Sequence, residues 1–168
     1  MTSVTALCKT LMGRWNITPQ NFVAHGDIAP GRKQDVSGYF NWTTFYAELE
    51  IFPGLFVSNI TANQQKGVLL SSSTNSNVVN ANVTNLQQRL SNYGYVSEID
   101  VNGIFDAKTE AVVEAFNRHF CPEIFVKEKE HTYDDNSSNS PNQQWYGISE
   151  ERLTYLLKNT NRDLCPQC

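Results

Sequence analysis

One histidine and one aspartate lie ten positions apart in a turn-rich stretch, and their side chains are of types that bind metal ions. His25 follows the apolar run 21–24, which predicts a buried strand that would hold the imidazole rigidly. The chain then turns at Pro30 and Gly31, so that Asp35 can return towards the ring. Imidazole nitrogens and carboxylate oxygens are zinc ligands. The same residue types more often have structural roles, so the spacing leaves both interpretations open.

The other histidines and the cysteines are weaker candidates for a site. His119 falls near the end of a predicted helix, where a positive charge interacts favourably with the helix dipole, and His131 lies in a charged loop. Cys165 and Cys168 form a CxxC pattern that no second pair accompanies. An exposed tail is therefore favoured over a zinc ribbon or a redox site.

Residues 1–53 carry the signals of two helices and one short strand. Apolar residues recur at helical spacing from Val4 to Met12. A second helix is predicted over 42–49, with four large apolar residues on one face: Trp42, Phe45, Tyr46 and Leu49. A lone strand leaves its backbone N–H and C=O groups unpaired. We therefore expect this block to be an α/β fragment of a larger domain.

The rest of the chain predicts a linker and a helical domain. Residues 54–83 are rich in Asn, Ser and Thr without a sustained hydrophobic period, which is typical of a flexible linker. Residues 84–168 predict an all-α domain of three helices. In that domain Asp106 would cap a long helix over 107–120, and Ser149 would cap the last one.

The stretch from His25 to Asp35 reads HGDIAPGRKQD and closely resembles the metal loop of type 2 N-acetylmuramoyl-L-alanine amidases, particularly those of the AmiD type. The sequences LMGRWNITP at 11–19 and FNW at 40–42 are also similar to that family. Its members are zinc hydrolases that cleave the amide between N-acetylmuramic acid and the peptide stem of peptidoglycan. The resemblance extends over residues 1–53.

By this resemblance His25 and Asp35 are zinc ligands, Zn²⁺ is the cofactor, and Lys33 is a catalytic residue that stabilises the oxyanion of the tetrahedral intermediate. The family also uses an earlier zinc-binding histidine and a catalytic glutamate between its two histidines. Neither can be assigned, because no histidine precedes His25. The alternative to a zinc-dependent amidase is therefore a truncated, inactive peptidoglycan-binding remnant, or one half of a split enzyme whose N-terminal half is encoded separately.

The second block resembles a peptidoglycan-binding domain of the three-helix type. The similar stretches are LQQRLSNYGY at 86–95, DVNGIFDAKT at 100–109 and AVVEAF at 111–116. Gly103 would permit a tight turn, and Tyr93 or Tyr95 would line a glycan groove together with polar side chains. Amidases of the AmiD type join these two domains in this order. The resemblances together predict the C-terminal portion of such an enzyme, with peptidoglycan or muropeptides as its partner.

Charge and hydropathy argue against two other kinds of partner. The formal net charge is −4, and no basic face is evident, so nucleic acid is not expected. No run of about 18 apolar residues occurs, so no membrane span is expected. The N-terminus also lacks the pattern of a secretory signal. The family resemblance implies the bacterial cell envelope, periplasmic or secreted, as the place of action.

Overall fold

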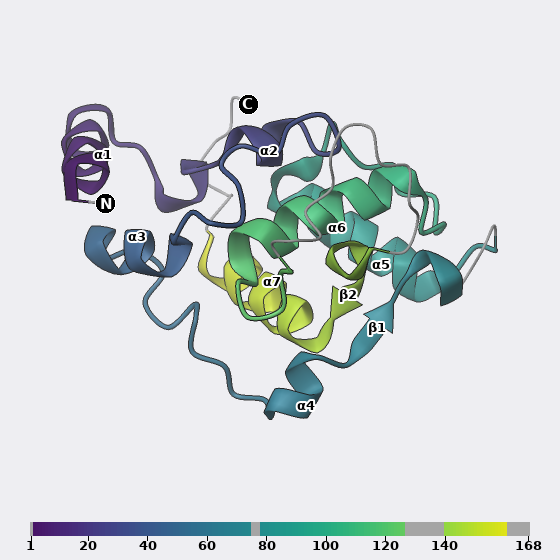
Figure 1. Ribbon diagram of the computed structural model, residues 1–168. Helices are drawn as coiled ribbons and strands as arrows, with labels where there is room; N and C mark the ends of the chain where they lie inside the picture. Colours follow the sequence, from purple (N-terminus) through teal and green to yellow (C-terminus); the bar gives the residue numbers. More distant parts are fainter. Residues whose placement is uncertain (1, 75–77, 127–139, 161–168) are drawn as a thin grey trace.

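The computed structural model describes residues 2–74, 78–126 and 140–160, and most of its elements are helices (Figure 1). In chain order, the α-helices and strands are α1 (Thr2–Trp15), α2 (His25–Ile28), α3 (Trp42–Leu49), α4 (Ala62–Gln65), β1 (Val68–Leu70), α5 (Ala81–Leu90), α6 (Ala107–Phe120), β2 (Trp145–Tyr146) and α7 (Gly147–Asn159). Short helical turns lie between them: η1 (Pro19–Asn21), η2 (Ser72–Thr74), the π-helical η3 (Ser91–Tyr95) and η5 (Pro141–Gln143).

Three helices, α5, α6 and α7, surround the main hydrophobic core, as the sequence predicts. Each contributes side chains that are almost inaccessible to solvent: Val83, Leu86 and Leu90 from α5, Val112, Phe116 and Phe120 from α6, and Ile148, Leu153 and Leu156 from α7. Local signals fix where α6 begins, because the side chain of Asp106 accepts a hydrogen bond from the Thr109 N–H at 2.9 Å. Burial of one apolar face per helix therefore accounts for this unit.

The first block packs against this unit. Trp42, Phe45, Tyr46 and Leu49 of α3 are buried and belong to the same continuous core. The ring of Trp42 stacks on that of His119 in α6, with centroids 3.6 Å apart. At its far end α3 lies beside α1, where Thr5 donates a 2.6 Å hydrogen bond to Glu48 (Figure 1). The block thus covers its apolar surface with the helical unit.

The predicted strand over 21–24 is wrong. Asn21 ends the turn η1, residues 22–24 follow in irregular backbone, and Val23 is 48% exposed. The nearby backbone donors bind elsewhere: the Phe22 N–H donates to the Pro19 carbonyl, and the Ala24 N–H donates to the Asp27 carboxylate. Among the described residues the only sheet is the antiparallel pair β1–β2, so an α/β architecture for residues 1–53 is not what the structure contains.

Part of the segment 54–83, expected to be a flexible linker, is folded onto the helical unit. Strand β1 pairs with β2, in the register Val68 opposite Tyr146 and Leu70 opposite Trp145. Helix α4 contacts α7, and Ser58 donates a 2.6 Å hydrogen bond to Glu151 of α7. Pairing between residues this far apart in sequence is not visible in a local hydrophobic pattern.

Two further details differ from the expectations. Helix α7 begins at Gly147, so Ser149 lies inside it, where its buried hydroxyl donates to Asn117 at 2.7 Å instead of capping the helix. Among the described residues, no helix is long and apolar enough to cross a lipid bilayer. His131, Cys165 and Cys168 lie outside the described residues.

Candidate functional site

The structure brings the two predicted metal ligands together. His25 is the first residue of α2, and its Nδ1 lies 3.0 Å from Oδ2 of Asp35. The backbone closes the same loop, because the Gly26 N–H donates a 2.7 Å hydrogen bond to the Asp35 carbonyl. Both side chains face solvent, with 49% of His25 and 68% of Asp35 exposed. The pair is therefore accessible to a ligand.

Close packing against α6 holds this loop in place. A Cβ added to Gly26 would lie 3.1 Å from a guanidinium nitrogen of Arg118, so the backbone approaches that side chain more closely than a larger residue allows. Gly31 has a φ of +73°, and an added Cβ would lie 3.1 Å from the Cβ of Ala111. Two glycines thus let the loop rest directly on α6.

Electrostatics favour the ionised form of Asp35. The hydrogen bond from His25 is the main cause that lowers the pKa of Asp35 below its ordinary value, and the positive charge of Lys33 adds a smaller effect in the same direction. Lys33 is exposed, and its N–H donates to the Ala29 carbonyl at 3.0 Å. Lys33 therefore shares the loop of the pair, and its positive charge acts weakly on the Asp35 carboxylate.

The pair does not by itself complete a zinc centre. Catalytic zinc sites use three protein ligands and a water, and structural sites use four protein ligands. In the parts of the chain that the structure describes, no group of three or more His, Cys, Asp or Glu residues is placed to hold a metal ion. His25 and Asp35 supply two donors of the right chemistry, and the described residues supply no third.

Behind α2 lies a buried polar cluster that the sequence did not predict. The Asp27 carboxylate accepts hydrogen bonds from the Ala24 N–H at 2.7 Å and from the Tyr95 hydroxyl at 3.1 Å, and it lies 2.7 Å from Nδ1 of His119. The opposite ring nitrogen of His119 lies 2.7 Å from the Tyr46 hydroxyl. His119 lies in the last turn of α6, where the sequence places it, but its side chain is 3% exposed and bound on both nitrogens, contacts that a helix-dipole interaction alone does not predict.

This cluster joins the first block to the helical unit. Burial is the main cause that raises the pKa values of Tyr46 and Tyr95 well above the ordinary tyrosine value, so both hydroxyls keep their protons at neutral pH. When the Tyr46 hydroxyl donates to Nε2 of His119, the Nδ1–H of the ring is left to donate to Asp27. One signal for His119 exists in the sequence: it follows Val112, Ala115 and Phe116 on the apolar face of α6.

A cleft of about 260 Å³ opens beside this cluster, between the two blocks. Its walls come from residues 20–28 on one side and from η3 and the residues after it on the other. Tyr93 and Tyr95, the expected lining of a glycan groove, are both buried in the core yet border this cleft. Asp27 and His119 border it as well. The cleft therefore lies where the first block meets the helical unit.

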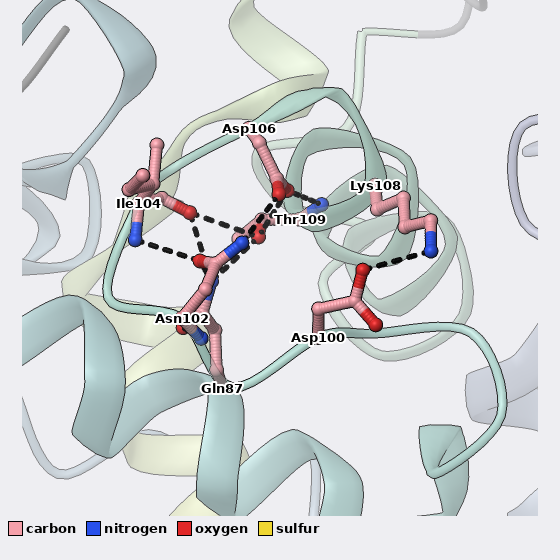
Figure 2. Close-up of polar contacts among 7 residues, drawn as sticks. All are labelled: Gln87, Asp100, Asn102, Ile104, Asp106, Lys108 and Thr109. Atoms are coloured by element: carbon pink, nitrogen blue, oxygen red, sulfur yellow. Dashed lines mark hydrogen bonds and ion pairs between the residues drawn. The ribbon is translucent and has the colours of Figure 1, made fainter. Parts of the chain in front are cut away.

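The stretch DVNGIFDAKT forms a closed polar network in the helical unit (Figure 2). The fully buried amide of Gln87 donates to Asn102 at 3.1 Å, to the Ile104 carbonyl at 2.8 Å and to Thr109 at 2.9 Å. Its oxygen accepts from the N–H groups of Asn102 and Gly103 at 3.1 and 2.8 Å. These contacts fix the turn before α6, which gives this stretch a structural role.

The chain matches one protein family and is similar to two amidases. Residues 79–124 match the family model described as "Putative peptidoglycan binding domain", and they contain α5, η3 and α6. The chain is 29% identical over 120 residues to the N-acetylmuramoyl-L-alanine amidase AmiD of Escherichia coli, an alignment that covers 71% of this chain and 39% of that protein. It is 41% identical over 46 residues to the 1,6-anhydro-N-acetylmuramyl-L-alanine amidase AmpD of Enterobacter cloacae, covering 27% and 25%.

The chain therefore spans about two fifths of the AmiD sequence and a quarter of the AmpD sequence. No solved structure gives a significant match. The similarities connect the chain with the cell wall, through a peptidoglycan-binding domain and a distant relationship to amidases that act on muramyl-L-alanine compounds.

Proposed function

We propose that the chain binds peptidoglycan in the bacterial cell envelope, and that His25 and Asp35 are its contribution to a zinc-dependent N-acetylmuramoyl-L-alanine amidase centre. The match of residues 79–124 to a peptidoglycan-binding model is the observation that carries the first part. The 120-residue similarity to an amidase, together with the 3.0 Å approach of the His25 and Asp35 side chains, supports the second.

Binding without hydrolysis is the activity that we expect of the described residues alone. A zinc ion held by only two protein ligands binds weakly, so the centre needs at least one more donor, from residues outside those described or from a second polypeptide. Lys33 would then stabilise the negative charge that develops on the amide oxygen, a role that its exposed ammonium can fill near the pair. In this proposal the chain is a peptidoglycan-binding module that also carries part of an amidase centre.

Sedimentation with purified sacculi tests the binding. The chain is incubated with sacculi, the insoluble polymer is collected by centrifugation, and the supernatant is examined for stem peptides by mass spectrometry. We expect the chain to sediment with the sacculi and the supernatant to contain no released stem peptide. Suppose that the wild type releases stem peptide and the His25→Ala variant does not. This result would contradict the proposal that the zinc centre needs a further donor, because the chain would then hold an active centre by itself.

Zinc binding tests the role of the pair. Equilibrium dialysis with Zn²⁺ compares the wild type with Asp35→Asn and with the matched control Asp100→Asn, whose carboxylate is also exposed and bonded to a neighbouring side chain, Lys108 at 2.8 Å. We expect weak zinc binding that Asp35→Asn reduces and Asp100→Asn leaves unchanged. Equal zinc binding by all three proteins would remove Asp35 from the proposed ligand set.

A further inference from the structure

The cleft between the two blocks has the dimensions of a site for one small ring. Its volume of about 260 Å³ is just below the range of about 300–1,000 Å³ that is usual for ligand pockets. Asp27 and His119, at its border, are nearly buried and bonded to each other, which gives the cleft a rigid base. A pocket that already exists before binding costs little conformational entropy when a ligand enters.

The cleft offers both hydrogen-bonding groups and apolar surface. Gln20 is half-buried, and its side-chain amide has no hydrogen-bond partner among the described residues. Asn21 and Ser97 are both exposed. The Asn21 amide donates to the Thr18 hydroxyl at 3.1 Å and the Ser97 hydroxyl donates to Glu98 at 3.2 Å, so what these two side chains offer a ligand is chiefly their acceptor oxygens. Val23 and Ile28, exposed by 48% and 60%, supply apolar surface beside them. Amides and hydroxyls next to apolar patches are the groups that recognise a polar, uncharged molecule with apolar faces.

Charge narrows the class of ligand. Among the described residues, two carboxylates border the cleft, and both have partners: Asp27 is bound by His119, and Glu98 lies 3.6 Å from the guanidinium of Arg32. No lysine or arginine is among the described residues that border it. An anionic ligand would find no cation there, and desolvating its charge would be unfavourable. A neutral ligand fits this lining better than a carboxylate-rich stem peptide.

From this lining we infer that the cleft binds one neutral N-acetylhexosamine unit of a glycan strand. The acetamido group and hydroxyls would bond to the side chains of Gln20, Asn21 and Ser97, and the acetyl methyl would contact Val23 or Ile28. This inference rests on the proposed function, because it assigns the glycan of peptidoglycan to a particular surface. It goes further in placing that surface at the junction of the two blocks and not on the helical unit alone.

The position of the cleft also relates the glycan to the candidate centre. The single turn of α2 presents Asp27 and Ile28 to the cleft, while its first residue, His25, faces solvent beside Asp35. A sugar in the cleft would therefore contact the same helical turn that carries the proposed zinc ligand. The glycan would be held beside the place where its amide substituent is to be cleaved.

Titration of the full chain with tri-N-acetylchitotriose, followed by NMR, tests the site. We expect saturable shifts of the Gln20 and Asn21 side-chain amides and of the Ser97 backbone amide. The Ser97→Trp substitution would fill the cleft and raise the dissociation constant about tenfold or more, because the sugar is excluded from its pocket. Val96→Asp is the control: Val96 is 70% exposed and does not border the cleft, so its replacement leaves the affinity unchanged.

A second variant and a second polymer separate this inference from the proposed function. Ile28→Asp, which places a charge in the apolar part of the cleft, should weaken binding of the saccharide as Ser97→Trp does. If both variants sediment with sacculi as the wild type does, the cleft is not the glycan-binding site, although the chain still binds peptidoglycan. If the wild type binds neither sacculi nor the saccharide, both the proposed peptidoglycan binding and the sugar site in the cleft are wrong. Shifts of the cleft amides by a free stem peptide but not by the saccharide would overturn the assignment to a sugar.

Discussion

Two polar loops meet α6, and they use their side chains in opposite ways. At the loop over 100–106, which leads into the helix, the buried amide of Gln87 in α5 binds three acceptors and two backbone donors (Figure 2). In the loop over 25–35, which packs on the side of the helix, the His25 and Asp35 side chains bind each other and face solvent. A polar sequence that satisfies its own groups specifies a fold, whereas one that exposes them can bind a ligand.

Removal of Gln87 should give the largest effect. Gln87→Ala removes the partner of the buried Gly103 N–H. It also takes one of the partners of the Asn102 N–H and of the Ile104 carbonyl, which keep their backbone bonds to Asp100 and Asp106. The unsatisfied Gly103 N–H costs about 1–3 kcal/mol, and the cavity left by the fully buried Gln87 side chain adds to that cost, so the free energy of unfolding should fall by about 4 kcal/mol. Urea unfolding measures this loss. Gln88→Ala, at an exposed neighbour bonded only to Asn92, should stay within about 0.5 kcal/mol of the wild type. If Gln87→Ala lowers the free energy of unfolding no more than Gln88→Ala does, the hydrogen bonds of Gln87 do not stabilise the fold.

His119→Ala should come next. It removes one partner of the buried Asp27 carboxylate and the stacking on Trp42 and Phe120. Loss of one partner from a buried polar pair costs about 3 kcal/mol. Hydrogen exchange should show faster opening of α3 and of residues 22–29, while α5 and α6 stay protected. His25→Ala, at the exposed histidine, should change stability by no more than about 0.5 kcal/mol. Equal destabilisation by the two substitutions would contradict the contrast between buried and exposed histidines.

A pair of glycine substitutions compares the loops directly. Gly103 has a φ of +75°, and an added Cβ would lie 2.7 Å from the Thr84 hydroxyl and 2.8 Å from Val79. Gly31 has a similar φ but would meet only the Ala111 Cβ, at 3.1 Å. The left-handed conformation costs an alanine about 1–2 kcal/mol at either position, and the clash adds to it at Gly103. Thermal unfolding should therefore rank Gly103→Ala as more destabilising than Gly31→Ala. The reverse order would mean that the loop over 25–35 is the more tightly packed.

The smallest effect concerns protonation of the exposed pair. The hydrogen bond from His25 lowers the pKa of Asp35, so the carboxylate is stabilised in the folded state. This contribution is present above the pKa of the unfolded carboxyl and is lost as the pH falls through the lower folded pKa. NMR titration of the Asp35 carboxyl should give a midpoint below the ordinary aspartate value in the wild type, and one closer to that value in His25→Ala. An unchanged midpoint in the variant would show that the two side chains do not interact in solution.

The sequence predicted those elements whose signals are local. Both Trp42–Leu49 and Ala107–Phe120 have the expected bounds, because each has a capping side chain, Asn41 or Asp106, in front of an amphipathic run. The approach of His25 and Asp35 was also expected from the turn between them. What could not be predicted depends on distant partners. The predicted strand over 21–24 has no neighbouring strand to pair with among the described residues, and β1 exists because it pairs with β2.

The buried cluster around Asp27 and His119 also depends on partners that are distant in the sequence, so the sequence did not predict it. Asp27 and His119 are 92 positions apart, and each alone is an ordinary polar residue in a loop or near a helix end. Only the docking of the first block onto α6 makes them partners. Ser149 has the residue type of a helix cap, yet it lies inside α7, where its hydroxyl donates to Asn117.

The fraction of the full chain that sediments with purified sacculi is the most direct test of peptidoglycan binding. The expected result is saturable sedimentation that soluble glycan fragments compete away. A chain that remains in the supernatant at every sacculus concentration would contradict the account.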